Sequence, residues 1–449
     1  MLTQTSSPIP TVSGLPILGN ALGLMKDAMG FLTAAYHTYG PVYKIQVPGR
    51  QIIILAGPQA NLLLMNSGET LFKLRPIYGK LVEETNSELY LPTLDEPEYS
   101  YYRKLIKPKL SRDALAAYMP QAMQKIEAMS ATWQPGQHVL VLQTVTQLCL
   151  EIIAGSTENS DLGDSLSDIV LFTNRLIGSG VAFQPAFLLK LPDYQNAKRR
   201  FEHYLQHIVD KHQAAAQDAT RPPSDDFVDL LLRSVKQDGS PLAANPADLL
   251  AYVHLPFVNG VAYAPRLTGY LLYELLRSPN LLQKVQAEID TLFANGTPGL
   301  QQFRAMRWLY GACLETMRMY PIAGALPRYV AQEFNFEGHT IPKGTLVFIA
   351  TGVTHFLPNV YRDPYTFDPE RYFEPRSEHH QPGAFAPYGL GSRTCLSAGM
   401  GESLIMLIVA ALLAKTRFAL PTPNYVLKSE IAPIPGPHRA FALRVVGRR

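Results

Sequence analysis

The feature that most constrains this chain is an apolar stretch of more than thirty residues near its middle. Residues 247–280 read ADLLAYVHLPFVNGVAYAPRLTGYLLYELLRSPN and end on a Pro-Asn stop. In a soluble protein, a helix with so little polar surface is buried on all sides. Pro256 and Pro265 cannot donate helical hydrogen bonds, and each bends such a helix. We therefore expect a large helical body built around a kinked central helix.

Composition limits the class of protein. The 449 residues are 47% hydrophobic and 17% charged, the balance of a globular protein. A core of this size can enclose a sizeable cofactor. The net charge of +3 is close to neutral and no Lys/Arg block stands out, which disfavours nucleic acid as a partner. The N-terminal residues resemble neither a signal peptide nor a membrane anchor, so we expect no membrane anchor. The three scattered cysteines fit a reducing cytoplasm, and we also expect a monomer.

Local patterns predict a mainly α fold with a small β-region. The leader 1–20 is rich in proline and glycine and should be extended. Residues 42–55, VYKIQVPGRQIIIL, predict a hairpin. The periodicity is mostly helical from about 103 to 318, and short strands with tight turns are predicted over 328–352. A last helix is expected over 401–418. No clean linker separates these parts, so we expect a single domain over 1–449.

The three cysteines are too few and too scattered for a disulfide framework or a CxxC metal site. One of them has an unusual setting, FAPYGLGSRTCLSAGMGE at 385–402. Gly389 and Gly391 allow a tight turn before Cys395, and a helix is expected to begin after it. Backbone N–H groups, the helix dipole and Arg393 all favour a negative charge on the sulfur. The setting suits a thiolate, as nucleophile or metal ligand, although an inert buried cysteine remains an alternative.

Two charged motifs lie upstream of this loop. Glu315 and Arg318 in ETMR lie one helical turn apart, and Arg371 follows in the loop DPYTFDPERY. Alone, the Glu-Arg pair could be a surface ion pair of little energetic value. The planar guanidinium of Arg371 could instead join the pair in a buried network of three charges.

In this order, the three elements resemble the motifs of the cytochrome P450 superfamily of haem-thiolate enzymes, and the resemblance covers nearly the whole chain. The family's Phe-x-x-Gly-x-Arg-x-Cys-x-Gly loop corresponds to 388–397, and its Pro-Glu-Arg-Phe-like loop to 369–372. The resemblance implies the cytochrome P450 fold, with a large helical body, an N-terminal β-sheet region and the I-helix, here 246–277, over the haem. It implies haem b, with Cys395 as the axial thiolate on iron. It also implies a structural triad that holds the cysteine loop, formed by Glu315, Arg318 and Arg371.

The resemblance further implies contacts to the haem propionates. Arg103 in DEPEYSYYRKLI matches the family's C-helix arginine, with Tyr99 at the position of a histidine. Arg328 and Arg393 match two more arginines of this kind. Three guanidinium groups suit two buried carboxylates.

The cysteine loop departs from the family pattern at two positions. Tyr388 replaces the phenylalanine that shields the sulfur, and its hydroxyl needs a partner. Ser397 replaces a glycine, so the turn must accept a side chain. Hydrogen bonding and packing near the sulfur can shift the haem potential.

The larger departure lies in the I-helix. Relatives that activate dioxygen usually carry Ala/Gly-Gly-x-Asp/Glu-Thr there. This chain reads NGVAYAP from Asn259, so Gly260 falls on the glycine, Ala262 on the acid and Tyr263 on the threonine. Delivery of a proton by a placed group is worth on the order of a hundredfold or more in rate. Pro265 should also leave a free carbonyl that could bind water or substrate.

Three functions remain open at this point. The protein could be a monooxygenase in which the substrate, Tyr263, or Asn259 through a water supplies the proton path. It could be a hydroperoxide-rearranging or peroxygenase-type enzyme that uses a ready-made O–O bond and needs no electron donor. It could also be a non-catalytic haem-binding or lipid-binding protein. Asn259 has an equally plain interpretation as a packing residue of the helix.

The resemblance places the substrate pocket around residues 75–92, 254–265 and 322–327. These segments are together mostly apolar, so a hydrophobic small-molecule substrate is expected. Tyr263, Asn259 and Tyr78 could orient it by hydrogen bonds. A monooxygenase of this length has no fused redox module and would need a separate ferredoxin- or flavodoxin-type electron donor. Lys104, Lys107 and Lys109 could meet an acidic donor, or could simply form a solvated helix face.

Overall fold

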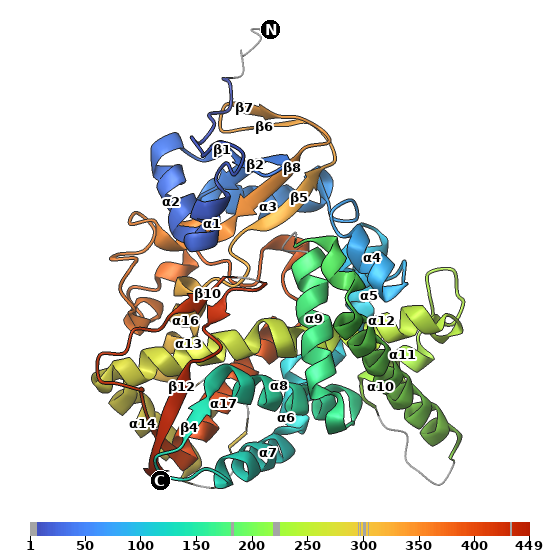
Figure 1. The fold of residues 1–449 in the computed structure, drawn as a ribbon, viewed down its shortest axis with the longest axis vertical. Coiled ribbons are helices and arrows are strands. Elements are labelled where there is room, and N and C mark those ends of the chain that lie inside the picture. Colours follow the sequence, from blue (N-terminus) through green and yellow to red (C-terminus); the bar gives the residue numbers. More distant parts are fainter. Residues whose placement is uncertain are drawn as a thin grey trace. The chain divides into compact units, whose positions relative to one another are not determined.

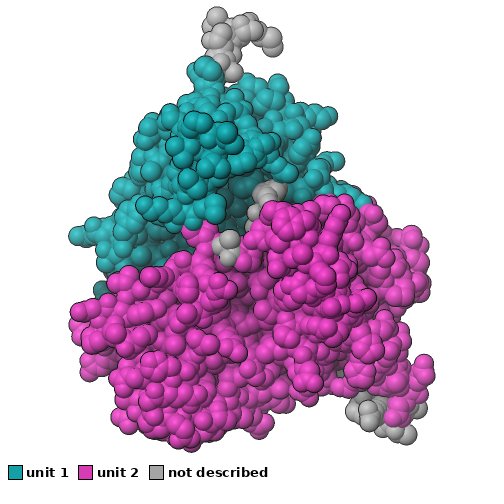
Figure 2. All heavy atoms as spheres, in the orientation of Figure 1, with its two compact units in different colours: residues 1–78, 94–96, 317–395 teal, residues 79–93, 97–316, 396–449 magenta. Residues whose placement is uncertain are grey.

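The central apolar stretch forms two helices in the structure, a computed structural model of the chain. It describes residues 7–180, 184–218, 225–294, 296, 298–299, 302–303, 305–431 and 433–449, without the side chain of Asn259. The chain divides into two compact units, coloured separately in Figure 2. Unit 1 comprises 1–78, 94–96 and 317–395, and unit 2 comprises 79–93, 97–316 and 396–449.

Unit 1 contains a five-stranded sheet in the order β1-β2-β8-β5-β3. The strands are β1 (Val42–Val47), β2 (Arg50–Ala56), β3 (Phe72–Lys73), β5 (Leu326–Val330) and β8 (Leu346–Ala350). β2 and β8 are parallel, and the other pairs are antiparallel. The predicted hairpin is confirmed, with Gly49 at φ 73° in the turn.

The hairpin forms because its apolar residues alternate between two covered faces. Tyr43, Ile45, Ile52 and Ile54 pack in one cluster with residues of α2 (Ala28–Tyr39). Val42, Ile53 and Leu55 pack in a second cluster with residues of α3 (Pro58–Leu71). The sheet is therefore covered by α2 on one face and by α3 on the other.

The predicted short strands after Arg328 are also present. Besides β5 and β8, β6 (Phe334–Phe336) and β7 (His339–Ile341) form a hairpin. Glu337 and Gly338 have φ of 49° and 79°, as a tight two-residue hairpin turn requires. Unit 1 also contains α1 (Ala21–Lys26) and four short 3-10 helices, Thr351–Phe356, Pro369–Tyr372, Glu378–His380 and Gly391–Arg393.

Unit 2 is mostly helical. Its longer helices are α5 (Glu98–Ile106), α7 (Met119–Ala131), α8 (Val141–Glu158), α9 (Leu166–Gly180), α10 (Pro192–Gln217), α12 (Pro246–Ala262), α13 (Ala264–Arg277), α14 (Pro279–Phe293) and α17 (Ala398–Lys415). Its shorter helices are α4 (Gly79–Thr85), α6 (Arg112–Ala117) and α11 (Phe227–Arg233). A helix shared by both units, α16 (Arg307–Met319), enters unit 1 at Met317.

Two small sheets complete unit 2. β4 (His138–Leu140), β12 (Ala442–Arg448) and β9 (Thr416–Ala419) form one antiparallel sheet, with β12 in the middle. β10 (Ser429–Glu430) and β11 (Gly436–Pro437) form a second pair. The predicted mainly α fold with a small β-region is confirmed (Figure 1).

The predicted kink in the central helix is a complete break. α12 ends at Ala262 and α13 begins at Ala264, with Tyr263 between them at φ −111°. Pro265 lies in the first turn of α13, a position that proline tolerates within a helix. Both helices are buried along most of their length, as the apolar composition predicted.

The last helix starts and ends three residues earlier than predicted. α17 spans Ala398–Lys415, because the β-prone segment Thr416–Ala419 pairs with β12 instead. Within the described residues, α17 is the one helix long and apolar enough to pass a membrane-span criterion, with 72% of its 18-residue window buried in the protein. A core helix gives the same signal.

Candidate functional site

The cysteine loop lies in unit 1 and forms the predicted tight turn. Gly389 and Gly391 have φ of 71° and 74°, values that favour glycine. A side chain at Gly391 would meet the carbonyl oxygens of Leu64 and Met65 at 3.1 and 3.0 Å, so the loop lies directly on α3. The turn closes where the Cys395 N–H donates to the Tyr388 carbonyl at 2.8 Å.

Cys395 is the only cysteine suited to thiolate chemistry. None of the three cysteines forms a disulfide, and Cys395 is half-buried whereas Cys149 and Cys313 are fully buried. Burial raises the pKa of the Cys149 and Cys313 thiols, which keeps both protonated. The 18-residue helix α17 begins three residues after Cys395, so the predicted helix after the cysteine is present. Its N-terminal N–H groups favour negative charge nearby in the chain.

Both departures in the loop are accommodated. The Tyr388 hydroxyl donates to the Met317 sulfur at 3.1 Å, so a thioether supplies the partner that the phenol needs. Ser397 has φ −108°, a conformation open to any residue, so the missing glycine causes no backbone strain.

Two of the predicted propionate arginines share one small cavity of unit 1. Arg328 and Arg393 both line it. Burial raises the pKa of Tyr78, and the two guanidinium groups oppose this shift, so all three side chains lie in one electrostatic environment. Arg393 binds Glu69 through two contacts of 3.0 and 3.3 Å and approaches Asp95 at 3.8 Å. The structure therefore joins Tyr78 to the predicted pair and adds two carboxylates that the sequence did not indicate.

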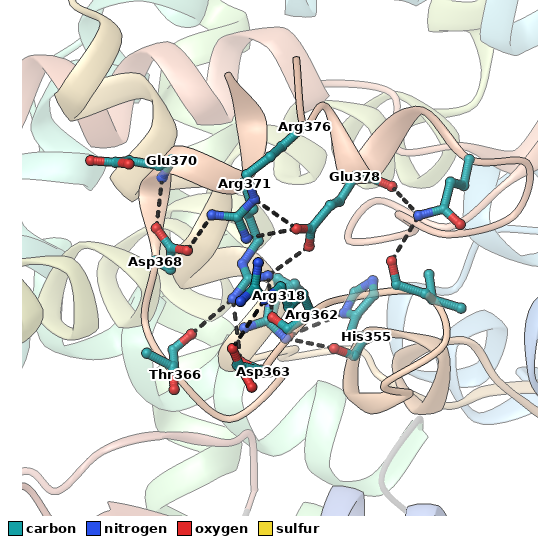
Figure 3. Close-up of polar contacts among 12 residues, drawn as sticks. Arg318, His355, Arg362, Asp363, Thr366, Asp368, Glu370, Arg371, Arg376 and Glu378 are labelled. Atoms are coloured by element: carbon teal, nitrogen blue, oxygen red, sulfur yellow. Dashed lines mark hydrogen bonds and ion pairs between the residues drawn. The ribbon is translucent and has the colours of Figure 1, made fainter. Parts of the chain in front are cut away.

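Arg371 is the centre of a buried network in unit 1 (Figure 3). Its side chain is fully buried. It donates to the carbonyls of Arg362 at 2.9 Å and Thr366 at 3.1 Å, and to the Glu378 carboxylate at 2.7 Å. Arg376 binds the same carboxylate at 2.6 Å. A guanidinium with this many acceptors fixes the path of the loop that carries it.

Arg318 and Arg371 both lie close to the aromatic ring of Tyr361. The guanidinium carbon of Arg318 is 5.1 Å from the Tyr361 ring centroid, and that of Arg371 is 5.8 Å away. Arg318 donates to the His355 carbonyl at 2.5 Å, and the His355 Nδ1 lies 3.1 Å from the Arg318 carbonyl. The Ala386 N–H donates to His355 Nε2 at 3.2 Å. Burial, with help from Arg318, lowers the pKa of His355 to about 3, so a neutral imidazole links the helix end to the segment before the cysteine loop.

Glu315, the third predicted triad member, lies one turn before Arg318 in α16 and is fully buried. All three predicted triad residues are thus buried. This excludes the alternative that Glu315 and Arg318 form a solvent-exposed ion pair. Sequence reasoning missed Tyr361, His355 and Glu378. The only available signal was the Arg376–Glu378 spacing beside two histidines, which is common in polar loops.

The third predicted propionate arginine lies in unit 2. Arg103 donates to the Tyr99 hydroxyl at 3.0 Å, one turn apart on α5. Tyr99 is buried and Arg103 half-buried. The structure thus brings together the two residues that the sequence assigned to the C-helix.

The distal candidates lie at the end of α12 in unit 2. Gly260 packs against α8: a side chain there would meet Leu150 and Ile153 at 2.8 and 2.9 Å. Ala262 is fully buried, and Tyr263 is half-buried in the break. Asn259 belongs to α12, but its side chain lies outside the described part of the structure.

The expected free carbonyl at the break is not free. Arg266, a residue that the sequence analysis missed, donates through Nη1 to the carbonyl of Val261, and to that of Ala262 at 3.0 Å. It is 6% exposed, and burial lowers its pKa to about 10, so it remains charged at neutral pH. The prediction of an open carbonyl for water or substrate was wrong, because a guanidinium from the next turn takes the place of the N–H that Pro265 lacks.

Comparison with known proteins identifies the class to which this fold and site belong. The family model for cytochrome P450 matches residues 8–434. The chain belongs to this family of haem-thiolate monooxygenases and is an oxidoreductase.

Particular relatives are distant but match along nearly their whole length. The chain is 23% identical over 428 residues to cyclooctat-9-en-7-ol 5-monooxygenase of Streptomyces melanosporofaciens, covering 92% of this chain and 90% of that protein. It is 22% identical over 433 residues to lanosterol 14-alpha demethylase of Mus musculus, covering 93% and 84%.

Solved structures show the same fold. Cyanobacterial CYP120A1 with retinoic acid bound has a TM-score of 0.83 at 21% identity, over 99% of this chain and all of that one. The haem domain of cytochrome P450DA has a TM-score of 0.85 at 22% identity, over 99% and 98%.

The family's cofactor is haem with an axial cysteine thiolate. The donor set of this chain fits that group chemically. A half-buried cysteine in a glycine turn, outside any disulfide, would offer a thiolate for iron, and arginines would offer charge-assisted hydrogen bonds for carboxylates.

Proposed function

We propose that this protein is a monooxygenase that oxidises a hydrophobic small molecule, with proton delivery assisted by the substrate or by water. The observation that carries the proposal is the break at Tyr263. The family's acid and alcohol positions hold Ala262 and Tyr263, and Arg266 occupies the carbonyls of Val261 and Ala262. No placed carboxylate or aliphatic alcohol from these positions supplies the proton, so Tyr263, Asn259 with a water, or the substrate itself does.

The haem, when bound, supplies dioxygen activation at iron. We propose that the Cys395 thiolate would bind its iron. Arg103, Arg328 and Arg393 would bind its carboxylates by charge-assisted hydrogen bonds, with the Tyr99 hydroxyl as a further donor. Glu315, Arg318 and Arg371 hold the cysteine loop through the buried network around Tyr361. Tyr388 shields the sulfur, with its hydroxyl turned to Met317.

Relatives support a hydrophobic substrate. The names of two of them give cyclooctat-9-en-7-ol and lanosterol, both with the suffix of an alcohol. The expected pocket segments of this chain, around 75–92, 254–265 and 322–327, are together mostly apolar. We propose a substrate of the same broad kind, a large apolar molecule with few polar groups.

P450 monooxygenases need electrons from a redox partner. We propose a separate ferredoxin- or flavodoxin-type donor, a single domain over 1–449 with an extended leader over 1–20, and a soluble cytoplasmic monomer. Of the three predicted docking lysines, Lys104 and Lys107 are exposed, whereas Lys109 binds the Asp225 carboxylate at 2.7 Å. The first two are the better docking candidates.

The second candidate is a peroxide-using enzyme, because the same altered helix is compatible with a substrate that already contains the O–O bond. The test is to mix the ferric holoprotein, without reductant, with hydrogen peroxide and with lipid hydroperoxides, and to follow peroxide loss and the haem spectrum. A monooxygenase should react slowly or lose its haem, and should form product with a surrogate ferredoxin, its reductase and dioxygen. Fast, repeated peroxide consumption with intact haem would overturn the proposal in favour of the second candidate.

A further inference from the structure

A buried histidine on α12 has a polar side chain for which the described part of unit 2 offers no hydrogen-bond partner. His254 is 2% exposed, and neither ring nitrogen has a hydrogen-bond partner among the described residues. An unsatisfied buried polar group is destabilising, and native proteins retain few of them. This suggests that the imidazole serves a partner from outside the chain.

Aromatic rings surround this imidazole. Tyr90 stacks on it with ring centroids 6.2 Å apart and an interplanar angle of 13°. Phe172 of α9 and Phe201 of α10 meet it edge-on at 5.2 and 5.5 Å. The three rings come from segments far apart in the sequence. Together they enclose the His254 imidazole in a cluster of aromatic side chains.

The position of His254 connects this cluster to the break in the helix. His254 precedes Gly260 by six residues on α12, which is about 9 Å along a helix axis. Tyr263 acts electrostatically on the phenol of Tyr90, the ring stacked on His254. His254 therefore lies on the same helix as residues to which the proposed function assigns the chemistry.

Burial lowers the pKa of His254 to about 3, so the ring is neutral at physiological pH. A neutral imidazole carries one N–H donor and one acceptor nitrogen. A hydroxyl group likewise donates once and accepts, so it matches the ring. A carboxylate could only accept, and would bring an uncompensated charge among aromatic rings.

We propose that His254 is the polar recognition residue for the substrate and binds a neutral hydroxyl group on an otherwise apolar molecule. This inference rests on the proposed function and narrows its substrate class. His254 is a specificity residue that touches substrate, and the aromatic rings around it bind the apolar part next to the hydroxyl. A site with one buried polar group discriminates against analogues that lack its partner, because the group is then left unpaired.

The test uses the ferric holoprotein and matched pairs of ligands that differ in one hydroxyl: menthol and menthane, cholestanol and cholestane, cholesterol and cholest-5-ene. Affinity is measured from the ligand-induced shift of the haem absorption band. The wild type should bind at least one alcohol about fivefold or more tightly than its hydrocarbon partner. His254→Phe keeps an aromatic ring and should bring that ratio close to one, whereas His254→Asn should keep part of the preference.

Tyr252→Phe is the matched control. Tyr252 lies two residues earlier on α12, is fully buried, and its hydroxyl also has no described hydrogen-bond partner, but its ring packs on Tyr102. The alcohol preference should survive this substitution. Absence of any preference in the wild type, or an unchanged preference in His254→Phe, would overturn the proposal.

Ligand-free stability gives an independent readout. If His254 awaits a substrate, His254→Phe should raise the midpoint of urea unfolding of the free protein. A lower midpoint would assign His254 a structural role and overturn the proposal. The carbon monoxide spectrum is recorded first for every protein. Loss of the thiolate signature in the wild type would refute the proposed function, whereas a normal signature without alcohol preference would refute only the role of His254.

Discussion

The guanidinium of Arg266 hydrogen-bonds the backbone carbonyl of Val261, the group that Pro265 deprives of its helical donor. The same nitrogen reaches the Ala262 carbonyl at 3.0 Å, and Nη2 lies 3.4 Å from the Asn174 amide oxygen. Gly436 allows this arrangement, because a side chain there would lie 2.8 Å from the Arg266 stem. A break that would otherwise expose two carbonyls is thus closed by one side chain from the following turn.

Arg266→Met should destabilise the protein by about 1–3 kcal/mol, because it leaves the buried carbonyl groups without donors. Urea unfolding of the holoprotein measures this change. Arg266→Lys retains one donor nitrogen and should recover part of the loss. Equal stability of the Met variant and the wild type would show that the carbonyls have another donor, and would contradict the assignment.

Cys395→Ala should abolish the carbon monoxide spectrum of a thiolate-ligated haem, since no other thiol can ionise. Cys149→Ala is the control: it removes a fully buried cysteine, should lower stability, and should leave the spectrum unchanged. A thiolate spectrum that persists in Cys395→Ala would show that the ligand lies elsewhere.

Arg371→Lys should lower stability by about 3–5 kcal/mol and reduce haem content, because a single ammonium cannot replace the fork that binds Glu378 and two carbonyls. Arg376→Lys changes a partly exposed arginine that binds the same carboxylate and should cost much less. Unfolding and haem content are measured for both. Similar losses of stability and haem content in the two variants would show that the burial of Arg371 does not determine its contribution.

Glu158→Gln should stabilise the protein at neutral pH. Both carboxylate oxygens lack a hydrogen-bond partner among the described residues, and burial, followed by repulsion from Asp226, raises the pKa of Glu158 well above its usual value. The folded wild type therefore holds a proton that the unfolded chain releases above about pH 4.3, and its stability falls as pH rises from there toward the raised pKa.

The Gln side chain is neutral at every pH, so the variant lacks this dependence. The two proteins should be similar in stability at about pH 4, and the variant should be ahead by on the order of 1 kcal/mol at about pH 8. Urea titrations over this range provide the comparison. A difference that does not change with pH would contradict a raised pKa for Glu158.

The sequence predicted the elements whose cause is local. The hairpin at 42–55 follows from alternation around Gly49, and the cysteine turn follows from Gly389 and Gly391. Pro265 predicted a kink in the central helix, but it did not predict that the helix would be divided into two. Each of these depends on backbone preferences that neighbouring residues determine.

Contacts between distant segments could not be predicted. The stacking of Tyr90 on His254 joins residues 164 positions apart, and the Tyr388 hydroxyl reaches a sulfur 71 positions away. Arg266 was missed for a different reason. An arginine inside an apolar helix suggested no role until the carbonyls it binds were located in three dimensions.

Gly260 is required by packing, whether or not the protein uses the family's oxygen-activating motif. Its missing side chain gives Leu150 and Ile153 of α8 the room they occupy, so the position is closed to larger residues by architecture alone. A descendant of this fold could abandon dioxygen altogether and still be obliged to keep that glycine. Its presence here therefore says nothing about the oxidant, and any inference about the chemistry depends on Ala262, Tyr263 and the groups that they contact.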